Sequence, residues 1–236
     1  MANAPKKRGL SADEMGRQQR EISVSEFFTK NRHLLGFDNP RKALLTAVKE
    51  AVDNALDASE EAGILPDIVV RLETVADGEG PVPPASQATR FKVTVVDHGP
   101  GIVRQQIPRI FAKLLYGSKF HRLRMSRGQQ GIGISAAGMY GQLTTGKPVT
   151  IISRTGANVP AHYFEVQIDT KKNEPIILEK KEIDWEKHRG TQVTLEMEGR
   201  YQKGRASVDE YLELTAIANP HATFTYHAPD GETKVY

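Results

Sequence analysis

The clearest periodic pattern of apolar and polar positions lies in residues 41–62 and predicts a helix. Asn39 can cap this helix, Pro40 suits its first turn, and Gly63 can end it. At 100° per residue, one face collects the apolar side chains of Leu44, Leu45, Val48, Ala51, Val52 and Ala55. The segment is therefore expected to bury that face against the rest of the domain.

Shorter apolar runs downstream predict strands. They lie at 67–75, 90–97, 149–155, 162–169, 175–182, 190–198 and 222–228. The stretch between the first two is rich in Gly and Pro, which predicts a loop joining neighbouring strands. Further helices are predicted at 104–115, 132–141 and 205–218. This mixture indicates an α/β domain.

The N-terminal part of the chain has no comparable pattern. Residues 1–22 are polar and basic, and we predict a disordered tail. Residues 23–38 carry scattered apolar anchors interrupted by Gly36, for which a short strand and a helical turn are predicted. We expect 39–236 to form a single domain, because no internal repeat or second domain is visible.

Composition narrows the class of protein. The 236 residues are 39% hydrophobic and 26% charged, as in ordinary soluble domains. No apolar run approaches the roughly 18 residues of a membrane span, and the N-terminus lacks a signal sequence, so we expect a cytoplasmic protein without a membrane partner. The absence of cysteine excludes disulfides and thiolate metal sites, and a net charge of +3 does not by itself indicate nucleic-acid binding.

The polar face of the first long helix carries candidate chemistry. Glu50, Asp53, Asn54 and Asp57 are spaced i, i+3, i+4 and i+7, and the simplest interpretation is a solvated surface. This face holds three acids and no base, and like charges at that spacing destabilise a helix. A cation would relieve the repulsion, and carboxylate and amide oxygens suit Mg²⁺. A further carboxylate here could accept a proton from an attacking water.

Two strand ends hold polar residues beside glycines. Asp97 ends a strand and is followed by Gly99 and Gly101, so its carboxylate could accept a hydrogen bond from an amino group such as that of adenine. The glycines would let a ligand approach the backbone closely. Thr191, after Gly190, could bond the edge of a base. Taken alone, each of these is equally an ordinary turn or strand start.

A glycine-rich stretch at 126–135 precedes a predicted helix of small residues. Gly128, Gly131 and Gly133 could expose backbone N–H groups as an anion site, although a plain flexible loop is the alternative. Residues 141–148 nearly match the phosphate-binding P-loop, but Pro148 replaces the required hydroxyl residue. We interpret that segment as a turn with a solvated Lys147.

The order of these motifs, from Glu50 to Thr191, resembles the GHKL ATPase family of gyrase, the large ATP-driven heat-shock chaperone, histidine kinases and MutL. The resemblance implies the Bergerat fold, an α+β two-layer sandwich whose mixed, mostly antiparallel sheet carries helices on one face. Within that family, residues 23–44, 113–151 and 211–232 resemble the B subunits of type IIB DNA topoisomerases, and 23–38 resembles their N-terminal strap.

The resemblance also implies roles for individual residues. Glu50 would be the general base, Asn54 the Mg²⁺ ligand and Asp97 the contact to adenine, with Gly101 and Thr191 assisting. Backbone groups of the glycine-rich lid would hold the ATP phosphates, namely Gly128, Gln129, Gln130, Gly131, Ile132 and Gly133. Asp53 and Asp57 would support the site.

The function implied is an ATP-hydrolysing dimerisation gate that couples nucleotide to DNA strand passage. Its expected partners are a second copy of itself, double-stranded DNA, and an A subunit that carries the DNA-cleaving tyrosine. Those B subunits use a lysine from a further domain at the γ-phosphate, so we expect the chain ending at Tyr236 to be a very slow ATPase. The alternative is a chaperone-like or kinase-like GHKL module that does not act on DNA.

Overall fold

A computed structural model describes residues 22–76, 78, 80–116 and 132–236. Its strands are β1 (Asp67–Thr74), β2 (Arg90–Asp97), β3 (Val149–Arg154), β4 (Ala161–Asp169), β5 (Glu174–Ile183), β6 (Gly190–Glu198), β7 (Thr223–His227) and β8 (Thr233–Val235). Its helices are α2 (Val24–Leu35), α3 (Pro40–Glu61), α4 (Ile107–Ala112), α5 (Gly133–Thr145) and α6 (Val208–Ala218).

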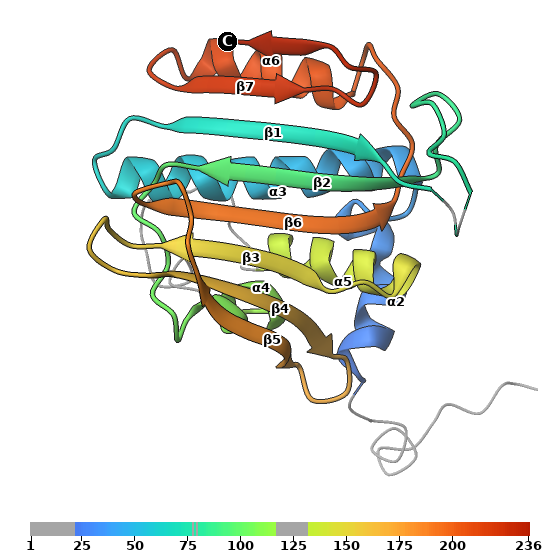
Figure 1. Ribbon diagram of the computed structural model, residues 1–236. Helices are drawn as coiled ribbons and strands as arrows, with labels where there is room; N and C mark the ends of the chain where they lie inside the picture. The colour runs from blue at the N-terminus through green and yellow to red at the C-terminus, as the bar shows by residue number, and fades with distance from the viewer. Residues whose placement is uncertain (1–21, 77, 79, 117–131) are drawn as a thin grey trace, which may run out of the picture.

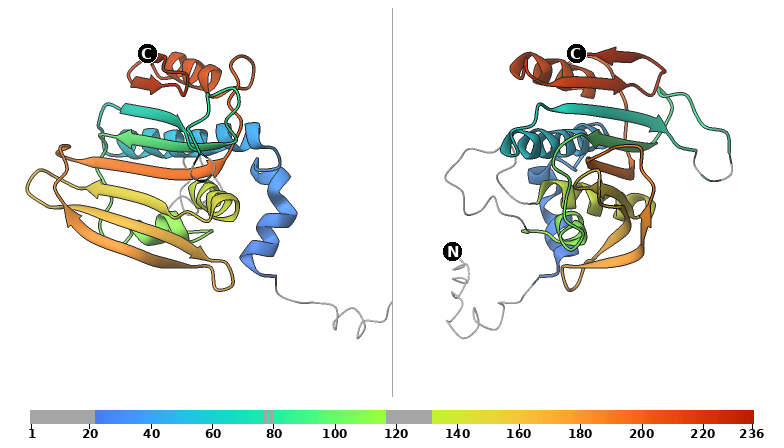
Figure 2. Two further views of the ribbon diagram at one scale, coloured as in Figure 1. Left: turned by 45° about the vertical axis from the view of Figure 1, so that its right-hand side comes forward. Right: turned by 60° about the vertical axis from the view of Figure 1, so that its left-hand side comes forward.

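The strands form one eight-stranded sheet in the order β5-β4-β3-β6-β2-β1-β7-β8. Every neighbouring pair is antiparallel except β1 and β7, which run parallel. The helices all lie on one face of this sheet, with α3 behind β1 and β2 and α5 behind β3 and β6 (Figures 1 and 2). The predicted two-layer architecture with a mixed, mostly antiparallel sheet is therefore confirmed.

The long helix α3 forms as its sequence predicts. The Asn39 side chain accepts hydrogen bonds from the backbone N–H groups of Arg41 and Lys42, and Pro40 occupies the first turn. Gly63 follows the helix with a φ of 67°. The apolar face of α3 packs onto the centre of the sheet, and this contact forms the main core.

The segment 23–38 differs from its prediction, because it forms the helix α2 and no strand. Ser23 caps the helix by accepting from the N–H of Glu26, and Gly36 ends it in the left-handed conformation. Ser and Glu three residues apart form a capping-box pattern, a start signal present in the sequence that the prediction missed. Phe28 and Phe37 then fold into the domain's own core, where the Phe37 ring lies 5.1 Å from that of Tyr140.

Smaller differences also have physical causes. Helix α4 begins at Ile107, three residues later than predicted, because a proline such as Pro108 fits only the first turn of a helix. It ends before Leu114, whose N–H donates to the Asn173 side chain in the β4–β5 connection. The short β8 was not predicted, since three residues carry too little pattern to identify a strand.

Candidate functional site

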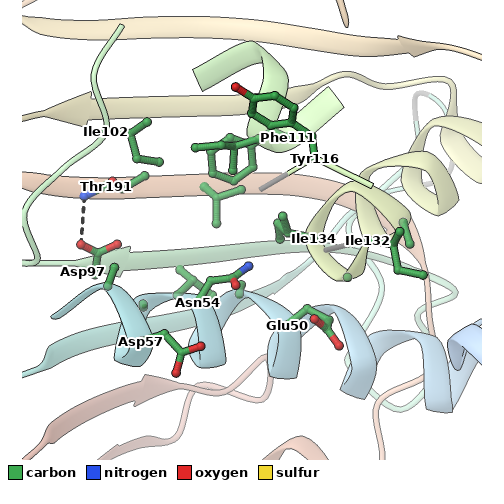
Figure 3. Close-up of a pocket in the computed structure, with 18 of the residues that line it drawn as sticks. Glu50, Asn54, Asp57, Asp97, Ile102, Phe111, Tyr116, Ile132, Ile134 and Thr191 are labelled. Atoms are coloured by element: carbon green, nitrogen blue, oxygen red, sulfur yellow. Dashed lines mark hydrogen bonds between the residues drawn. The ribbon is translucent and has the colours of Figure 1, made fainter. Parts of the chain in front are cut away.

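A pocket of about 600 Å³ lies between α3, α5 and the centre of the sheet. Figure 3 shows Asp57, Asn54 and Glu50 in sequence along α3 beneath it, with Asp97 near the Asp57 end and Ile132 near the Glu50 end. Glu50 and Asp57 are seven positions apart in the helix, which corresponds to about 10 Å along the axis. The pocket is therefore elongated, with different chemistry at its two ends.

Asp97 lies at one end of the pocket. The residue is only 9% exposed, and its Oδ1 accepts hydrogen bonds from the backbone N–H of Gly99 at 2.8 Å and of Thr191 at 3.2 Å. Burial raises the pKa of Asp97 from 3.8 to about 6, and these two backbone bonds and the nearby His98 only partly offset that rise. Both backbone bonds end on Oδ1, so Oδ2 can accept a further hydrogen bond from a ligand in the pocket.

Gly101 shapes the pocket wall beside Asp97. It has a φ of 73°, and a Cβ there would lie 2.1 Å from the backbone carbonyl oxygen of Arg154. No side chain fits between these two backbone segments, so the glycine allows the turn after β2 to close onto the end of β3. The apolar walls nearby come from Val95, Ile102, Ile110, Phe111, Tyr116 and Val193.

Glu50 and Gly133 meet at the opposite end. A Cβ on Gly133 would fall 1.7 Å from a carboxylate oxygen of Glu50, so this acid packs directly against the first residue of α5. The N-terminus of a helix carries partial positive charge and N–H groups directed outward, which favour anions. Ile132, Gly133 and Ile134 all line the pocket here. The predicted lid residues Gly128, Gln129, Gln130 and Gly131 lie outside the described residues.

Asn54 lies between the two ends and lines the pocket. Its amide supplies one neutral oxygen, and the described residues contain no cluster of three acids or histidines of the kind that cages a metal. Mg²⁺ typically takes one or two protein oxygens and completes its coordination with phosphates and water. The donors present thus fit a metal that enters together with a phosphate ligand.

The acidic residues on this face of α3 have different surroundings in the folded domain. Asp57 lines the pocket, whereas Asp53 does not. Asp53 turns toward α6, where its Oδ1 accepts from the Tyr211 hydroxyl at 2.8 Å and its Oδ2 pairs with Lys49 at 2.6 Å. The expectation that this face holds no base is wrong, because Lys49 lies one turn before Asp53. Asp53 therefore connects two helices and does not line the pocket.

Ser153 is a polar contributor that the sequence did not reveal. Its hydroxyl accepts from the N–H of Ile102 at 2.8 Å, donates to the carbonyl of Gly190 at 3.1 Å and lies 3.0 Å from the Thr191 hydroxyl. It therefore connects three backbone segments behind the Asp97 end. A serine near the end of an apolar strand is only a weak signal, and its partners become visible only in the folded sheet.

The near-P-loop at 141–148 takes no part in the pocket. It forms the last turns of α5 and the connection to β3, with Gly146 as a left-handed cap and Lys147 exposed. The interpretation as a turn is therefore right for 146–148 and for the exposed Lys147, but wrong for 141–145, where α5 continues.

Comparison with known proteins shows that one protein family matches most of the chain. The family described as "Histidine kinase-, DNA gyrase B-, and HSP90-like ATPase" matches residues 39–200, which contain both ends of the pocket. The chain belongs to this ATPase family. Two solved structures have a similar fold. The topoisomerase IV ATP-binding domain of Francisella tularensis gives a TM-score of 0.56 at 15% identity, over 91% of this chain and 54% of that one. The 43K ATPase domain of Thermus thermophilus gyrase B gives a TM-score of 0.55 at 16% identity, over 90% of this chain and 50% of that one.

Curated relatives within the family are much more similar in sequence. The B subunit of type 2 DNA topoisomerase 6 from Methanosarcina acetivorans is 55% identical over 95% of this chain, and that from Archaeoglobus fulgidus is 56% identical over 92%. The matched regions cover 35% and 34% of those proteins, so the chain spans about a third of their length. Among the residues that the structure describes, no helix is long and apolar enough to cross a membrane.

Proposed function

We propose that this protein binds ATP with Mg²⁺ and hydrolyses it, as the dimerisation gate of a type IIB DNA topoisomerase. The observation that carries the proposal is the division of one pocket into a buried acceptor, Asp97, and a helix N-terminus beside a carboxylate, Glu50. A base with an amino group fits the first end and phosphates fit the second. The family and the B subunits of topoisomerase 6 among its relatives support the same ligand.

In this proposal, the residues at the two ends of the pocket and Asn54 between them have defined roles. Asp97 accepts the amino group of adenine, and the amides at the start of α5 bind phosphate oxygens. Asn54 offers its oxygen to Mg²⁺, which supplies charge neutralisation to the phosphates when bound. Glu50 accepts a proton from the water that attacks the γ-phosphate. The lid residues 128–131 are proposed to complete the phosphate site.

The wider role concerns partners. ATP would bring two copies of the protein together, and an A subunit carrying the DNA-cleaving tyrosine would open double-stranded DNA for strand passage. The B-subunit relatives, more than half identical to this chain, support this role. A location in the cytoplasm at the nucleoid follows from a DNA substrate and belongs to the same proposal. A chaperone-like or kinase-like member would show no dependence on DNA or on an A subunit.

Replacement of Glu50 by alanine tests the proposal in the full-length protein with its A subunit. We expect ATP to bind, measured by calorimetry, while ATP hydrolysis falls about 10²–10⁴-fold, the usual loss for a general base. ATP-driven strand passage should be lost with it. Glu60→Ala is the matched control, because Glu60 is exposed on the same helix and does not line the pocket. Near-normal hydrolysis by Glu50→Ala would contradict the role of Glu50, and absence of strand passage by the parent protein would contradict the topoisomerase role.

A further inference from the structure

Three residues form a row across the sheet behind the Asp97 end of the pocket. Asp97 on β2 is paired with Thr191 on β6, and Thr191 is paired with Ser153 on β3. Thr191 lines the pocket, whereas Ser153 is fully buried and does not. Ser153 therefore reaches a ligand only through neighbours that line the pocket, and of these Thr191 is the one whose side chain it contacts through a hydrogen bond.

The hydrogen bonds of Ser153 determine where the two hydroxyl protons lie. A serine hydroxyl has one proton to donate and two lone pairs to accept with. One lone pair receives the N–H of Ile102 at 2.8 Å. The carbonyl of Gly190, 3.1 Å away, can only accept, so the serine proton points to it. The remaining contact, 3.0 Å from the Thr191 Oγ1, must then use the proton of Thr191.

We infer that Ser153 is a positioning residue for base selection, which holds the hydroxyl proton of Thr191 away from the pocket. This inference rests on the proposed function, in which a nucleotide base occupies the Asp97 end. With its proton directed to Ser153, Thr191 offers the pocket only lone pairs. The two side-chain groups facing the base edge, Asp97 and Thr191, are then both acceptors.

Two acceptors that face position 6 of a purine distinguish bases by the substituent at that position. The 6-amino group of adenine donates hydrogen, so it is satisfied there. The 6-oxo group of hypoxanthine or guanine is an acceptor, and it would face acceptors with no donor between them. Buried polar groups left unpaired in this way give large discrimination between ligands. Without Ser153, the Thr191 hydroxyl could rotate and donate to the 6-oxo group.

The experiment measures binding of ATP and of inosine triphosphate, which has the 6-oxo group but no 2-amino group. Calorimetry on the full-length chain compares four proteins: the parent, Ser153→Ala, Thr191→Val and the double variant. In Ser153→Ala we expect the preference for ATP, the Kd for inosine triphosphate divided by that for ATP, to fall about fivefold. In the Thr191→Val background, Ser153→Ala should leave this ratio unchanged, because the hydroxyl through which it acts is gone.

The outcomes separate this inference from the proposed function. A parent protein that binds both nucleotides equally contradicts the assignment of the base to the Asp97 end. A parent that prefers ATP, with an unchanged ratio in Ser153→Ala, overturns the role of Ser153 alone. An equal fall in both backgrounds also overturns it, since that result reflects general damage to the pocket. If Ser153→Ala does not fold, Ser153→Cys replaces it, with a smaller shift in the same direction, because a thiol is a weaker hydrogen-bonding group.

Discussion

At the residue scale, the buried carboxylate of Asp97 lowers the stability of the folded domain at neutral pH. The pKa of Asp97 in the folded protein, about 6, is higher than its ordinary value of 3.8, because burial disfavours the charged form. The unfolded chain therefore ionises more readily than the folded one. The resulting penalty is absent below about pH 4, grows from pH 4 to 6 and is complete above pH 6.

Replacement of Asp97 by asparagine should remove this penalty. In the absence of nucleotide, we expect Asp97→Asn to be more stable than the parent above pH 6, by up to about 3 kcal/mol at about 1.4 kcal/mol per pKa unit. The gain should disappear below pH 4, where both side chains are neutral. The same variant should lose its preference for ATP over GTP. Urea denaturation at pH 4 and pH 7.5 measures the stability, and equal differences at the two pH values would contradict this account.

Asn54 provides a second prediction at this scale, for the metal. Asn54→Ala should weaken binding of Mg·ATP about tenfold or more, since a charge-assisted contact is lost. Binding of ATP in EDTA should change much less. Asn54→Asp is the control, because it keeps an oxygen at the same place. Calorimetry with and without Mg²⁺ gives the comparison, and equal weakening in both conditions would rule out a ligand role for Asn54.

At the element scale, α3 is held from two sides. Its apolar face packs on the sheet, and Asp53 connects its flank to Tyr211 on α6 and to Lys49 within α3. Burial, followed by the charge of Asp53, raises the pKa of Tyr211, so its hydroxyl remains a donor. The sequence placed Asp53 on the same helical face as Asn54. Only the packing of α6 shows that the two side chains serve different purposes.

Tyr211→Phe should therefore destabilise the domain by about 1–3 kcal/mol, because a buried carboxylate oxygen loses its partner. Lys49→Met should cost less, since Lys49 is an exposed partner and exposed ion pairs contribute little. Neither variant should change ATP affinity, because neither residue lines the pocket. Thermal denaturation and calorimetry test both statements. A loss of ATP affinity in Tyr211→Phe at unchanged stability would show that Asp53 acts on the ligand.

At the scale of the whole molecule, α2 provides the surface that we propose for a second copy. Phe28 and Phe37 are buried in the domain's own core, whereas Leu34 is 73% exposed and Phe27 is 39% exposed. These last two are seven residues apart, so they share one stripe of the helix. The predicted strap thus has an inner side that stabilises its own domain and an exposed side, on which Leu34 also lines the pocket and Phe27 does not.

We expect the protein to be monomeric without nucleotide and to dimerise with a non-hydrolysable ATP analogue. Phe27→Ser should weaken the dimer about tenfold, as expected for loss of an aromatic contact at an interface. Thr29→Ala, an exposed position off this stripe, is the control. Because Phe27 does not line the pocket, the affinity of the monomer for the analogue should not change. Sedimentation with and without the analogue measures the strength of the dimer. If Phe27→Ser dimerises as strongly as the parent, the interface lies elsewhere.

The sequence by itself determined the elements with strong periods and the order of the motifs. The pattern of α3 defined its cap, its buried face and the positions of Glu50 and Asn54, because helix geometry is local and repeats along the chain. The strands that carry Asp97 and Thr191 followed in the same way from their apolar runs. The motif order was sufficient to predict the fold, since matching several motifs in sequence is far more specific than matching any one.

Only the tertiary structure decided which polar residues meet. Asp53 and Asn54 are adjacent in the chain, yet one binds α6 and the other lines the pocket. Ser153 reaches Thr191, 38 positions further along the chain, because the antiparallel register of β3 and β6 places them side by side. Local patterns carry no information on such pairings, since register and helix packing are set by burial of the whole core.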